Sequence, residues 1–600
     1  MYPVTAKWKE ETEQTLRNPS YVRIVFGVTD PDAPGLSTPT DNGHLPYSDV
    51  DSVDVGTTAP STYQTLERNR FILDGKNPLP PESNPIYQGY AGLTISGDAG
   101  AYTTKPLVKI SFGDYVQFPG LTFQFDDSMG DYPNSFRILA KKDSVSVFDK
   151  TYSPDTTYWE MTDQIPLCNE LSFYWLNSNI PHRRARLLSL TYGLVSRLGS
   201  DDIASCSSTK EIDLLSSKIP KQEFEFTLID TQRRYDPENP SGLWEYLESR
   251  QPVNYQYGYE LSDGSIEWIP WGLSYSTGDF DVSKSGIVAE VSIKCVGLAD
   301  HLTMTYDEGV YSAAGRSLFD LATDVMKFAG FENTIELDNA LKTIYTHNPL
   351  PSSKVNECLQ LIANAGRCIM NHSRGGYIQI LRENDSATGF DINFDKMTDT
   401  PTTTKIPPLR NLSVEYNSIK VNSEVTAAVN AAEVSSDAAH EYTFTHSAYT
   451  NQQIVLSSGL TMVGTAKFYA YKTVVTLKGT GTVTINGNSL TENKIEYRKK
   501  YSDVGEDLSG VSNTLIDNQT DAIAYANWVA AVTLRRNTYS APDRGYPELD
   551  VGDSVNFTSN FANETPVTMV QQKLTYNGAI KASANISLGV VVNGLDNTDF

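Results

Sequence analysis

Apolar and polar positions alternate along most of this 600-residue chain, and few stretches keep a helical period. Val253, Tyr255, Tyr257 and Tyr259 alternate with polar or small residues, which predicts a strand with one buried face. The segment YVRIVFGV, residues 21–28, predicts the first strand, and between about 60 and 195 short runs such as LVKISF, LTFQF and ELSFYWL recur between turns. This spacing is typical of a β-sandwich, so the chain is predicted to be mainly β.

The helical period appears in three places. A first helix is predicted to begin at Ser317 and to end at Gly330, with these apolar positions on one face: Leu318, Leu321, Ala322, Val325 and Ala329. A second begins near Ser352 or Ser353 and ends at Gly366, and the segment CIMNHSRGGYIQIL then predicts two strands around a Ser-Arg-Gly-Gly turn. Together these elements predict a small α+β domain. A third helix is predicted over about 517–536.

Turn-forming residues are concentrated in DTQRRYDPENPSGLWEYL, residues 230–247. Asp236-Pro237 and Asn239-Pro240 initiate turns, because proline presets φ, and glycine at 242 tolerates positive φ. Leu243–Leu247 has room for one or two helical turns before the strand that carries Tyr255 and Tyr257. This stretch is predicted to be the corner of a barrel or sandwich, and nothing in it indicates catalysis.

Length and charge narrow the function. Six hundred residues predict three to five domains. The 48 basic and 73 acidic residues give a net charge of −25, which argues against tight binding of DNA but suits a channel through which DNA slides. Simple solubility is the alternative explanation of this charge.

No signal peptide and no apolar run of about eighteen residues is found, so synthesis in a cytosol without stable membrane insertion is expected. The five scattered cysteines predict buried, reduced thiols.

No motif of a known catalytic type occurs, and the seven histidines have no ligand spacing, so neither an enzyme nor a cofactor is predicted. A glycosidase would need two placed carboxylates, which the sequence cannot single out among 73 acidic residues. Asp126, Asp127 and Asp131 form a weak calcium candidate whose alternative is a solvated turn, and the Asp49–Gly56 segment is a weaker one. Aromatic residues that could stack on sugar rings, or else fill turns and core, are Tyr87, Tyr90, Tyr102 and Tyr132.

Three segments resemble the baseplate hub proteins of bacteriophage tails. The first is residues 210–272, which contain RYDPENPSGLWEYL; the second is GRCIMNHSRGGYIQIL, residues 366–381; and the third is residues 513–557, from NTLIDNQT to LDVGDSVNF. They follow the order found in that family. The resemblance implies a first tail-tube-like barrel, a small α+β domain and a second barrel.

A further block resembles galactose-binding-like, discoidin-type jelly rolls. The residues that carry this resemblance are TLERNRFILDG (65–75), residues 106–138 and IPHRRARLLSLTYG (180–193). The expected domains are therefore 1–59 for the first part of barrel one, 60–195 for an inserted jelly roll, 196–310 for the rest of barrel one, 311–405 for the α+β domain and 406–600 for barrel two. Residues 421–510 are expected to form a β-rich insertion in barrel two that resembles no named family.

The hub resemblance implies a structural protein of a tail tip or baseplate in a virion, made in the bacterial cytoplasm. It implies a homotrimer that joins the sixfold tail tube to a threefold tip and opens for DNA. The implied partners are tail-tube ring proteins, a tape-measure protein and a central spike or fibre, with a host glycan as a further candidate. The corner is expected at a subunit contact, through Tyr235, Asp236, Pro237, Asn239, Pro240, Trp244, Tyr255 and Tyr257. The alternative is a carbohydrate-binding or carbohydrate-cleaving protein that works through the jelly roll.

Overall fold

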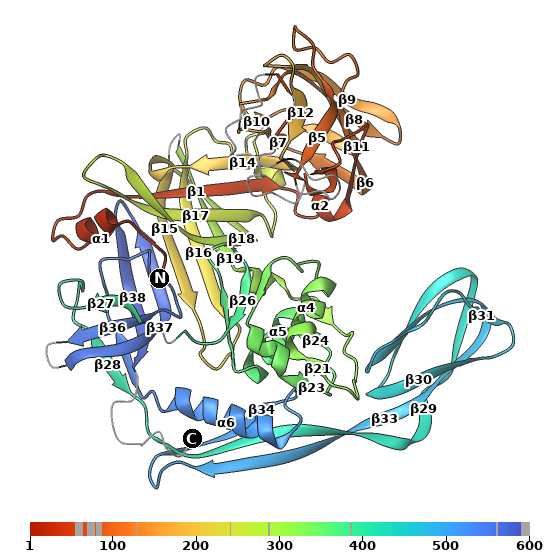
Figure 1. The fold of residues 1–600 in the computed structure, drawn as a ribbon, viewed down its shortest axis with the longest axis vertical. Helices are drawn as coiled ribbons and strands as arrows, with labels where there is room; N and C mark the ends of the chain where they lie inside the picture. Colours follow the sequence, from red (N-terminus) through yellow and green to blue (C-terminus); the bar gives the residue numbers. More distant parts are fainter. Residues whose placement is uncertain are drawn as a thin grey trace.

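The computed structural model describes residues 1–53, 64–65, 67–68, 79, 87–128, 130–240, 242–285, 288–384, 387–559 and 562–589. Strands hold 53% of the residues and helices 12%, so the prediction of a mainly β, multidomain chain is confirmed. Figure 1 shows a jelly roll at the top, a large sheet on the left, a small helical domain in the centre and a long β arm along the base and right-hand side.

One 13-stranded sheet forms the frame of the molecule. Its first half contains β14 (Gly193–Leu198), β1 (Ser20–Thr29), β17 (Pro252–Glu260), β18 (Ile266–Ser285), β19 (Val288–Val296), β16 (Lys221–Asp230) and β15 (Ile203–Glu211). Its second half contains β37 (Ala562–Tyr576), β38 (Ile580–Gly589), β35 (Asn537–Ser540), β28 (Thr402–Lys405), β36 (Ser554–Ser559) and β27 (Ala387–Ile392). The halves join where β15 pairs antiparallel with β37, from Cys206 opposite Tyr576 to Glu211 opposite Gln571. The two expected barrels are therefore two halves of one continuous sheet.

Each half of the sheet has its own core. The first is rich in aromatic side chains, and Phe224 stacks on Tyr255 with ring centroids 3.7 Å apart. The second packs Tyr546, Leu549 and Met569. The alternation that predicted a one-faced strand at Tyr255–Tyr259 is confirmed, because these tyrosines are buried on β17.

The jelly roll leaves the frame after β1 and returns at β14. Its main sheet has the order β2 (Ser37–Asp41), β6 (Leu107–Phe118), β11 (Ile165–Ser178), β8 (Pro133–Lys142) and β9 (Val145–Tyr152). The remaining elements are α2 (Ala33–Leu36), β3 (Ser48–Asp49), η1 (Val50–Ser52), β4 (Tyr87–Gln88), β5 (Tyr90–Ile95), β7 (Leu121–Gln124), β10 (Tyr158–Met161), β12 (Arg184–Leu187) and β13 (Ser189–Thr191). Since Ser37–Asp41 pairs with β6, the inserted domain begins just after Thr29 and the expected boundary at 60 is wrong. The chain returns to the frame at Gly193, where β14 begins and pairs with β1.

The small α+β domain is built around two helices, α4 and α5, that pack against each other. It contains α3 (Leu298–His301), β20 (Thr305–Tyr306), β21 (Arg316–Ser317), α4 (Leu318–Phe328), β22 (Ile335–Leu337), η4 (Asn339–Thr343), β23 (Tyr345–Thr346), β24 (Ser353–Lys354), α5 (Val355–Ala365), β25 (Ile369–His372) and β26 (Ile378–Leu381). The Ser317 hydroxyl accepts the N–H of Asp320 at 3.1 Å, and Gly330 has φ +78°, which are the caps that the sequence predicts. The hairpin of β25 and β26 is also confirmed.

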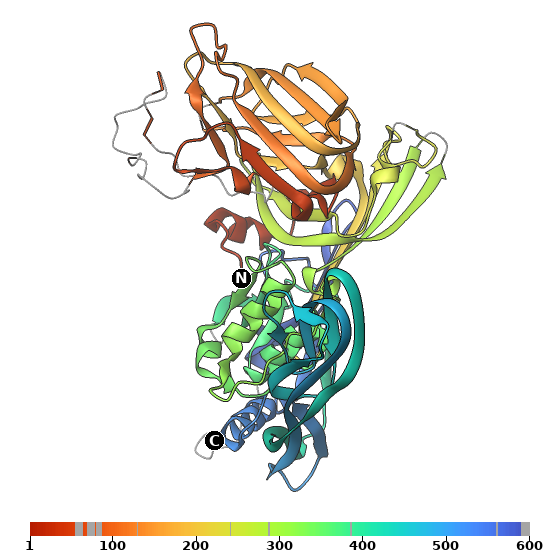
Figure 2. The ribbon, with the colours of Figure 1, turned by 90° about the vertical axis from the view of Figure 1, so that its right-hand side faces the viewer.

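The arm occupies the region that resembled no family. It consists of β29 (Leu409–Thr445) paired with β33 (Lys472–Lys500), with β34 (Glu506–Asn513) at its base and β30 (Tyr449–Leu456), β31 (Leu460–Met462) and β32 (Lys467–Phe468) along the other edge of β33. The third predicted helix is α6 (Gln519–Thr533). Together with the base of the arm, it packs against the core of the small domain. Figure 2 shows the arm folding against the small domain at the end of the molecule opposite the jelly roll.

The remaining elements are α1 (Ala6–Thr12), η2 (Ser200–Asp202) and η3 (Trp244–Tyr246). The short helix η3 is the turn of helix expected after the corner. In the part of the chain that the structure describes, no helix is long and apolar enough to cross a membrane. All five cysteines are buried free thiols, as predicted, and burial raises the pKa of Cys206 to about 12.

Candidate functional site: the sheet corner and the domain junctions

The corner of residues 230–243 is held by two buried carboxylates. Asp230 accepts the N–H groups of Arg234 and Tyr235 at 2.9 and 2.7 Å. The Asp236 carboxylate, fully buried, pairs with Lys284 at 2.8 Å and accepts the N–H of Glu238 at 2.9 Å. These hydrogen bonds hold the pKa of the Asp236 carboxyl well below its usual range. The turn residues of the sequence thus build a rigid loop whose charges are internally paired.

The inner side of the corner contacts its own chain rather than a free surface. The Tyr235 hydroxyl lies 2.6 Å from the Ser196 hydroxyl on β14, in the core. Arg234 and Leu243, together with Glu160 of the jelly roll, line a cavity of about 260 Å³. Burial raises the pKa of Glu160, and the charge of Arg234 opposes this. The corner therefore forms part of the surface that contacts the jelly roll.

The predicted contact residues divide into two sets. Tyr235, Asp236, Tyr255 and Tyr257 are buried within this chain, and β17 lies between β1 and β18 without a free edge. The prediction that these four side chains touch a neighbouring subunit is wrong, because they are core residues. The other four, exposed or partly exposed, are Pro237, Asn239, Pro240 and Trp244.

A second site, which sequence reasoning missed, lies where the small domain meets both halves of the sheet. Arg374, in the turn between β25 and β26, donates to the Asp550 carboxylate at 3.0 Å. It also donates to four backbone carbonyls at 2.7–3.2 Å: those of Pro270, Pro547, Glu548 and Leu549. One guanidinium therefore binds the first half of the sheet, through Pro270, and the second half, through the 547–550 loop. We call this contact the inner junction.

Lys210 completes the inner junction from β15. Its side chain is 1% exposed, and its ammonium lies 3.1 Å from both oxygens of Asp550 and 4.8 Å from the centre of the Trp271 ring. Burial lowers the pKa of Lys210. Burial also opposes the charge of Asp550, but Lys210 and Arg374 outweigh it and keep the pKa of that carboxyl below its usual value. The only sequence signals were a lysine at an inward position of a strand and an arginine in a glycine-rich turn.

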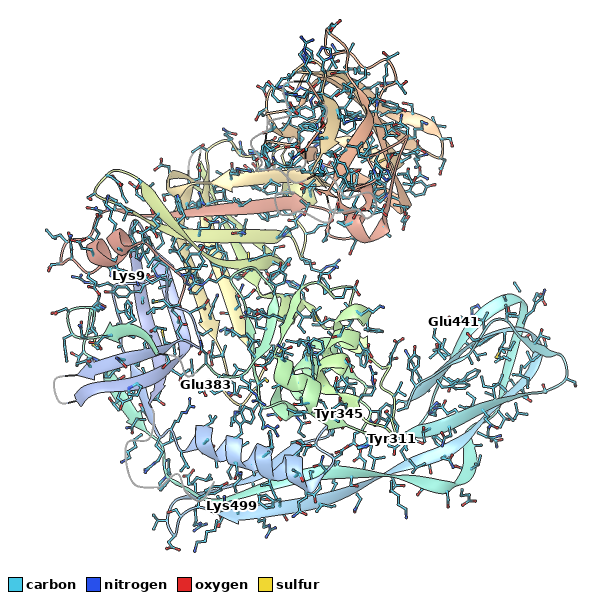
Figure 3. The ribbon with its side chains drawn as sticks, in the orientation of Figure 1. Lys9, Tyr311, Tyr345, Glu383, Glu441 and Lys499 are labelled. Atoms are coloured by element: carbon cyan, nitrogen blue, oxygen red, sulfur yellow. The ribbon has the colours of Figure 1, made fainter. Side chains whose placement is uncertain are left out.

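Two further sets of contacts join parts of the chain near the inner junction. Glu383, labelled in Figure 3 between the small domain and the second half, accepts from Arg535 at 2.7 Å and from the Thr568 hydroxyl at 2.9 Å. Trp8 of α1 is fully buried and packs edge-on against Tyr259 at 5.1 Å, while Arg17 donates to the carbonyls of Arg544 and Gly545. The N-terminal segment therefore binds both halves of the sheet.

In the jelly roll, the calcium candidates are paired with arginines. Asp131 and Asp126 are buried; Asp131 accepts from Arg183 at 2.9 Å, and Asp126 lies 3.6 Å from Arg186. Arg186 also pairs with buried Glu67. Within the described ranges no group of three His, Cys, Asp or Glu side chains could hold a metal. The weak calcium candidate is therefore not supported at Asp126 and Asp131, which are buried beside arginines, and Asp127 lies in the turn beside them.

The predicted sugar-stacking tyrosines are mostly interior. Tyr90 is fully buried against Trp175, and Tyr102 is 5% exposed. For these two rings the core alternative holds, and sugar stacking does not, because neither ring has a free face. Tyr132 is partly buried against the core, and Tyr87 lies in β4 with its side chain outside the described residues.

Comparisons with known proteins return only structural likenesses. No family model matches the chain and no curated protein matches its sequence. The chain is similar to the 43 kDa tail protein of prophage MuSo2 from Shewanella oneidensis (11% identity, 66% of this chain and 95% of that chain, TM-score 0.37). It is also similar to prophage tail protein gp18 from Listeria monocytogenes (10%, 66% and 91%, TM-score 0.36).

A separate likeness covers 28% of this chain and 97% of a family 32 carbohydrate-binding module from C. perfringens NanJ, solved with galactose, at 10% identity and a TM-score of 0.18. All three TM-scores are below 0.5, so these likenesses do not by themselves define the fold or the function of this chain.

Proposed function

We propose that this chain is a structural hub of a phage-type tail tip, a component of a virion with no catalytic role. The observation that carries the proposal is the continuous sheet, in which two halves are joined edge to edge by β15 and β37 and clamped by Arg374. Both halves and the small domain contain the segments whose sequence resembles tail hubs. A single rigid body with two sheet halves is the unit that such a hub needs.

Three copies about a threefold axis would supply six sheet halves to a tail tube of sixfold symmetry, and would still end on a threefold spike or fibre. Closed rotational symmetry allows every copy to use the same head-to-tail contact. Tube-ring and tape-measure proteins would be the axial neighbours. The net charge of −25 disfavours retention of DNA in the central channel.

The exposed side of the corner, residues 237–240, is available for the contact between copies. Its rigidity favours this role, because a loop with Asp230 and Asp236 already hydrogen-bonded loses little conformational entropy on binding. The buried members of the corner then act by holding the loop in place.

Carbohydrate binding through the jelly roll is the second candidate from the sequence. The burial of Tyr90 and Tyr102 removes two of its four proposed contacts. The tail-hub function therefore accounts for more of the chain.

The proposal is tested by the native mass of the purified full chain at increasing concentration. A species of three times 66.3 kDa is expected. A stable hexamer, or a monomer at every concentration and in the assembled particle, would contradict the proposal.

A further inference from the structure

The distal arm, residues 421–490, is a sheet with two open edges. Its central strand is β33, with β29 along one side and β30, β31 and β32 along the other. At the base, β34 covers β29 only as far as Tyr416. Beyond that point, no strand among the described residues pairs with the outer side of β29, or with the outer sides of β30, β31 and β32. An open sheet edge presents N–H and C=O groups that can pair with a strand of another chain.

The two edges have few of the residues that protect sheet edges from pairing, such as proline and lysine. Residues 421–445 of β29 contain no proline and no lysine, and residues 449–468 contain no proline and one lysine. The distal arm as a whole has seven charged residues in seventy, whereas 20% of the whole chain is charged. Depletion of charge is typical of the central part of a protein interface, so both edges are suited to pairing.

The charges that remain are separated between the two edges. We define the acidic edge as residues 421–445 of β29, and the lysine edge as residues 449–468, which contain β30, β31 and β32. The acidic edge has no lysine or arginine, and the only charge of the lysine edge is Lys467. Four exposed carboxylates on the acidic edge form no ion pair within the described ranges: Glu424, Glu433, Asp437 and Glu441. Like charges on neighbouring strands are destabilising, so the acidic edge does not suit a second acidic edge but does suit the lysine edge.

The register of the sheet places opposite charges at nearly the same level of the two edges. Lys467 pairs with Val474 of β33, and Val474 pairs with Thr443 of β29. Residues directly opposite share a face of the sheet, and so do residues two apart in a strand, so Lys467 and Glu441 lie on one face. Glu441 is labelled on the arm in Figure 3.

The direction of the strands also allows a rotation to join the two edges. Both edge segments run antiparallel to β33, so they run parallel to each other. A rotation about an axis along the strands would therefore bring Lys467 of one copy beside Glu441 of the next without reversing either strand.

The distal arm is firm enough to present both edges. It has a core of its own, in which Leu477 is fully buried. The N–H of Ala470 donates to the Gly309 carbonyl at 2.7 Å, and Lys472 forms an ion pair with Asp307, which anchors the arm to the small domain. Figure 1 shows the arm on the side of the molecule opposite the large sheet, so the frame lies away from both edges.

Apolar side chains are exposed on both edges. Val425 on the acidic edge is 63% exposed, and on the lysine edge Val455 is 54% and Met462 47% exposed. Apolar side chains gathered on one firm element indicate a contact with another protein surface. Pairing of the edges would remove part of this surface from water, which adds to the free energy of the backbone hydrogen bonds.

We infer that the lysine edge of one copy pairs, strand to strand, with the acidic edge of a second copy of this chain. Each copy carries both edges in one sheet, so the contact is head-to-tail and repeats around a closed ring. With three copies, the three arm sheets become one closed sheet without open edges. This inference rests on the proposed ring and names a contact that holds it together.

Native residues allow a direct test, because a carbodiimide joins a lysine to a carboxylate only when the two groups are in contact. Equal amounts of unlabelled and ¹⁵N-labelled full chain are mixed at low concentration, concentrated and treated with the carbodiimide, and the cross-linked peptides are identified by mass. A Lys467–Glu441 peptide with one labelled and one unlabelled half is expected. A trimer that gives no mixed peptide between the lysine edge and the acidic edge would overturn the pairing but leave the proposed ring; a monomer at all concentrations would contradict both.

Exchange of the two charges gives a second readout. Lys467→Glu and Glu441→Lys each place like charges together, and each is expected to weaken self-association by about tenfold at low salt. The double variant restores opposite charges and is expected to recover most of the affinity. Single variants that associate like the unmodified chain, or a double variant that associates no better than the single ones, would overturn the pairing.

The matched control is Lys9→Glu. It makes the same change of charge at an exposed position of α1, which Figure 3 labels on the other side of the molecule. This variant is expected to associate like the unmodified chain, and a loss as large as that of Lys467→Glu would contradict a contact at the lysine edge. Circular dichroism of all four variants checks that they are folded.

Discussion

The two junctions of this molecule are built in opposite ways. At the inner junction, Arg374 uses its donors on one carboxylate and four carbonyls, and Lys210 is buried beside it. At the outer junction, between the jelly roll and the frame, the ion pair of Arg250 with Asp32 is exposed, and cavities of about 260 and 790 Å³ remain. The inner junction therefore makes the two sheet halves and the small domain one body. The outer junction attaches the jelly roll to this body as a separate domain.

Connectivity supports the same distinction. The jelly roll is linked to the frame by β1 and β14, where Thr29 pairs with Gly193. Gly193 has φ +148°, and a Cβ there would lie 2.2 Å from the Val28 carbonyl oxygen, so only glycine allows the two chain crossings to lie side by side. An insertion whose ends are this close adds little loop-closure entropy to the frame.

The largest expected effect follows from Arg374→Ala. The substitution removes five hydrogen bonds and leaves the buried Asp550 carboxylate paired with Lys210 alone. The free energy of unfolding of the frame should therefore fall by ~3–5 kcal/mol. Denaturant unfolding, with hydrogen exchange at residues 547–550, measures this. The control is Arg410→Ala, whose pair with Asp507 is exposed to solvent and should therefore contribute far less to stability than the buried Arg374. Equal losses in the two variants would contradict the inner junction as described.

The inner junction also shows what the sequence could not predict. Strands and helices followed from local alternation and capping residues, such as Ser317 and Gly330. Lys210 and Asp550 are 340 positions apart, and no local pattern marks either as a partner. Likewise, the residues Ser37–Asp41 have no apolar alternation, so β2 looks like a loop until its pairing with β6 is known. The sequence around Tyr90 and Tyr102 does not distinguish them from exposed tyrosines, because their burial depends on the packing of distant strands.

The next effect concerns pH and the jelly roll alone. Burial disfavours the Glu67 carboxylate, but hydrogen bonds and charge from Arg186 outweigh burial and lower its pKa from 4.5 to about 2. A lowered pKa stabilises the fold above the unfolded value, so this contribution is complete above pH 4.5 and is lost as the pH falls through about 2. The loss should reach ~3 kcal/mol.

The measurement is the unfolding temperature of the jelly roll, followed by tryptophan fluorescence between pH 5 and 2. Glu67→Gln should be less stable than the unmodified chain at pH 5 and should flatten this part of the profile. A profile unchanged by the substitution would show that Glu67 is not the group responsible.

A smaller effect is expected from removing the whole jelly roll. Replacing residues 31–192 with a short Gly/Ser linker keeps β1 and β14 paired, so the stability of the frame should change by no more than ~1 kcal/mol. Denaturant unfolding monitored by hydrogen exchange in β16 and β19 tests this. Aggregation of the shortened chain, or loss of cooperative unfolding, would mean that the jelly roll is part of the frame.

The smallest effect is expected from Arg250→Ala. The Arg250–Asp32 pair is 2.8 Å long, but its side chains are 47% and 62% exposed, so the change in stability should be within ~0–1 kcal/mol. The informative measurement is how the free energy of unfolding depends on salt concentration. This dependence should be weak in the unmodified chain and in the Arg250→Ala variant. A loss as large as that of Arg374→Ala would remove the contrast between the two junctions.

Symmetry analysis of electron microscopy images of the particle that contains this chain tests the central claim most directly. The account predicts three copies around the axis, each contributing two sheet halves to a ring of six. A ring of six copies, or a single copy on the axis, would contradict it.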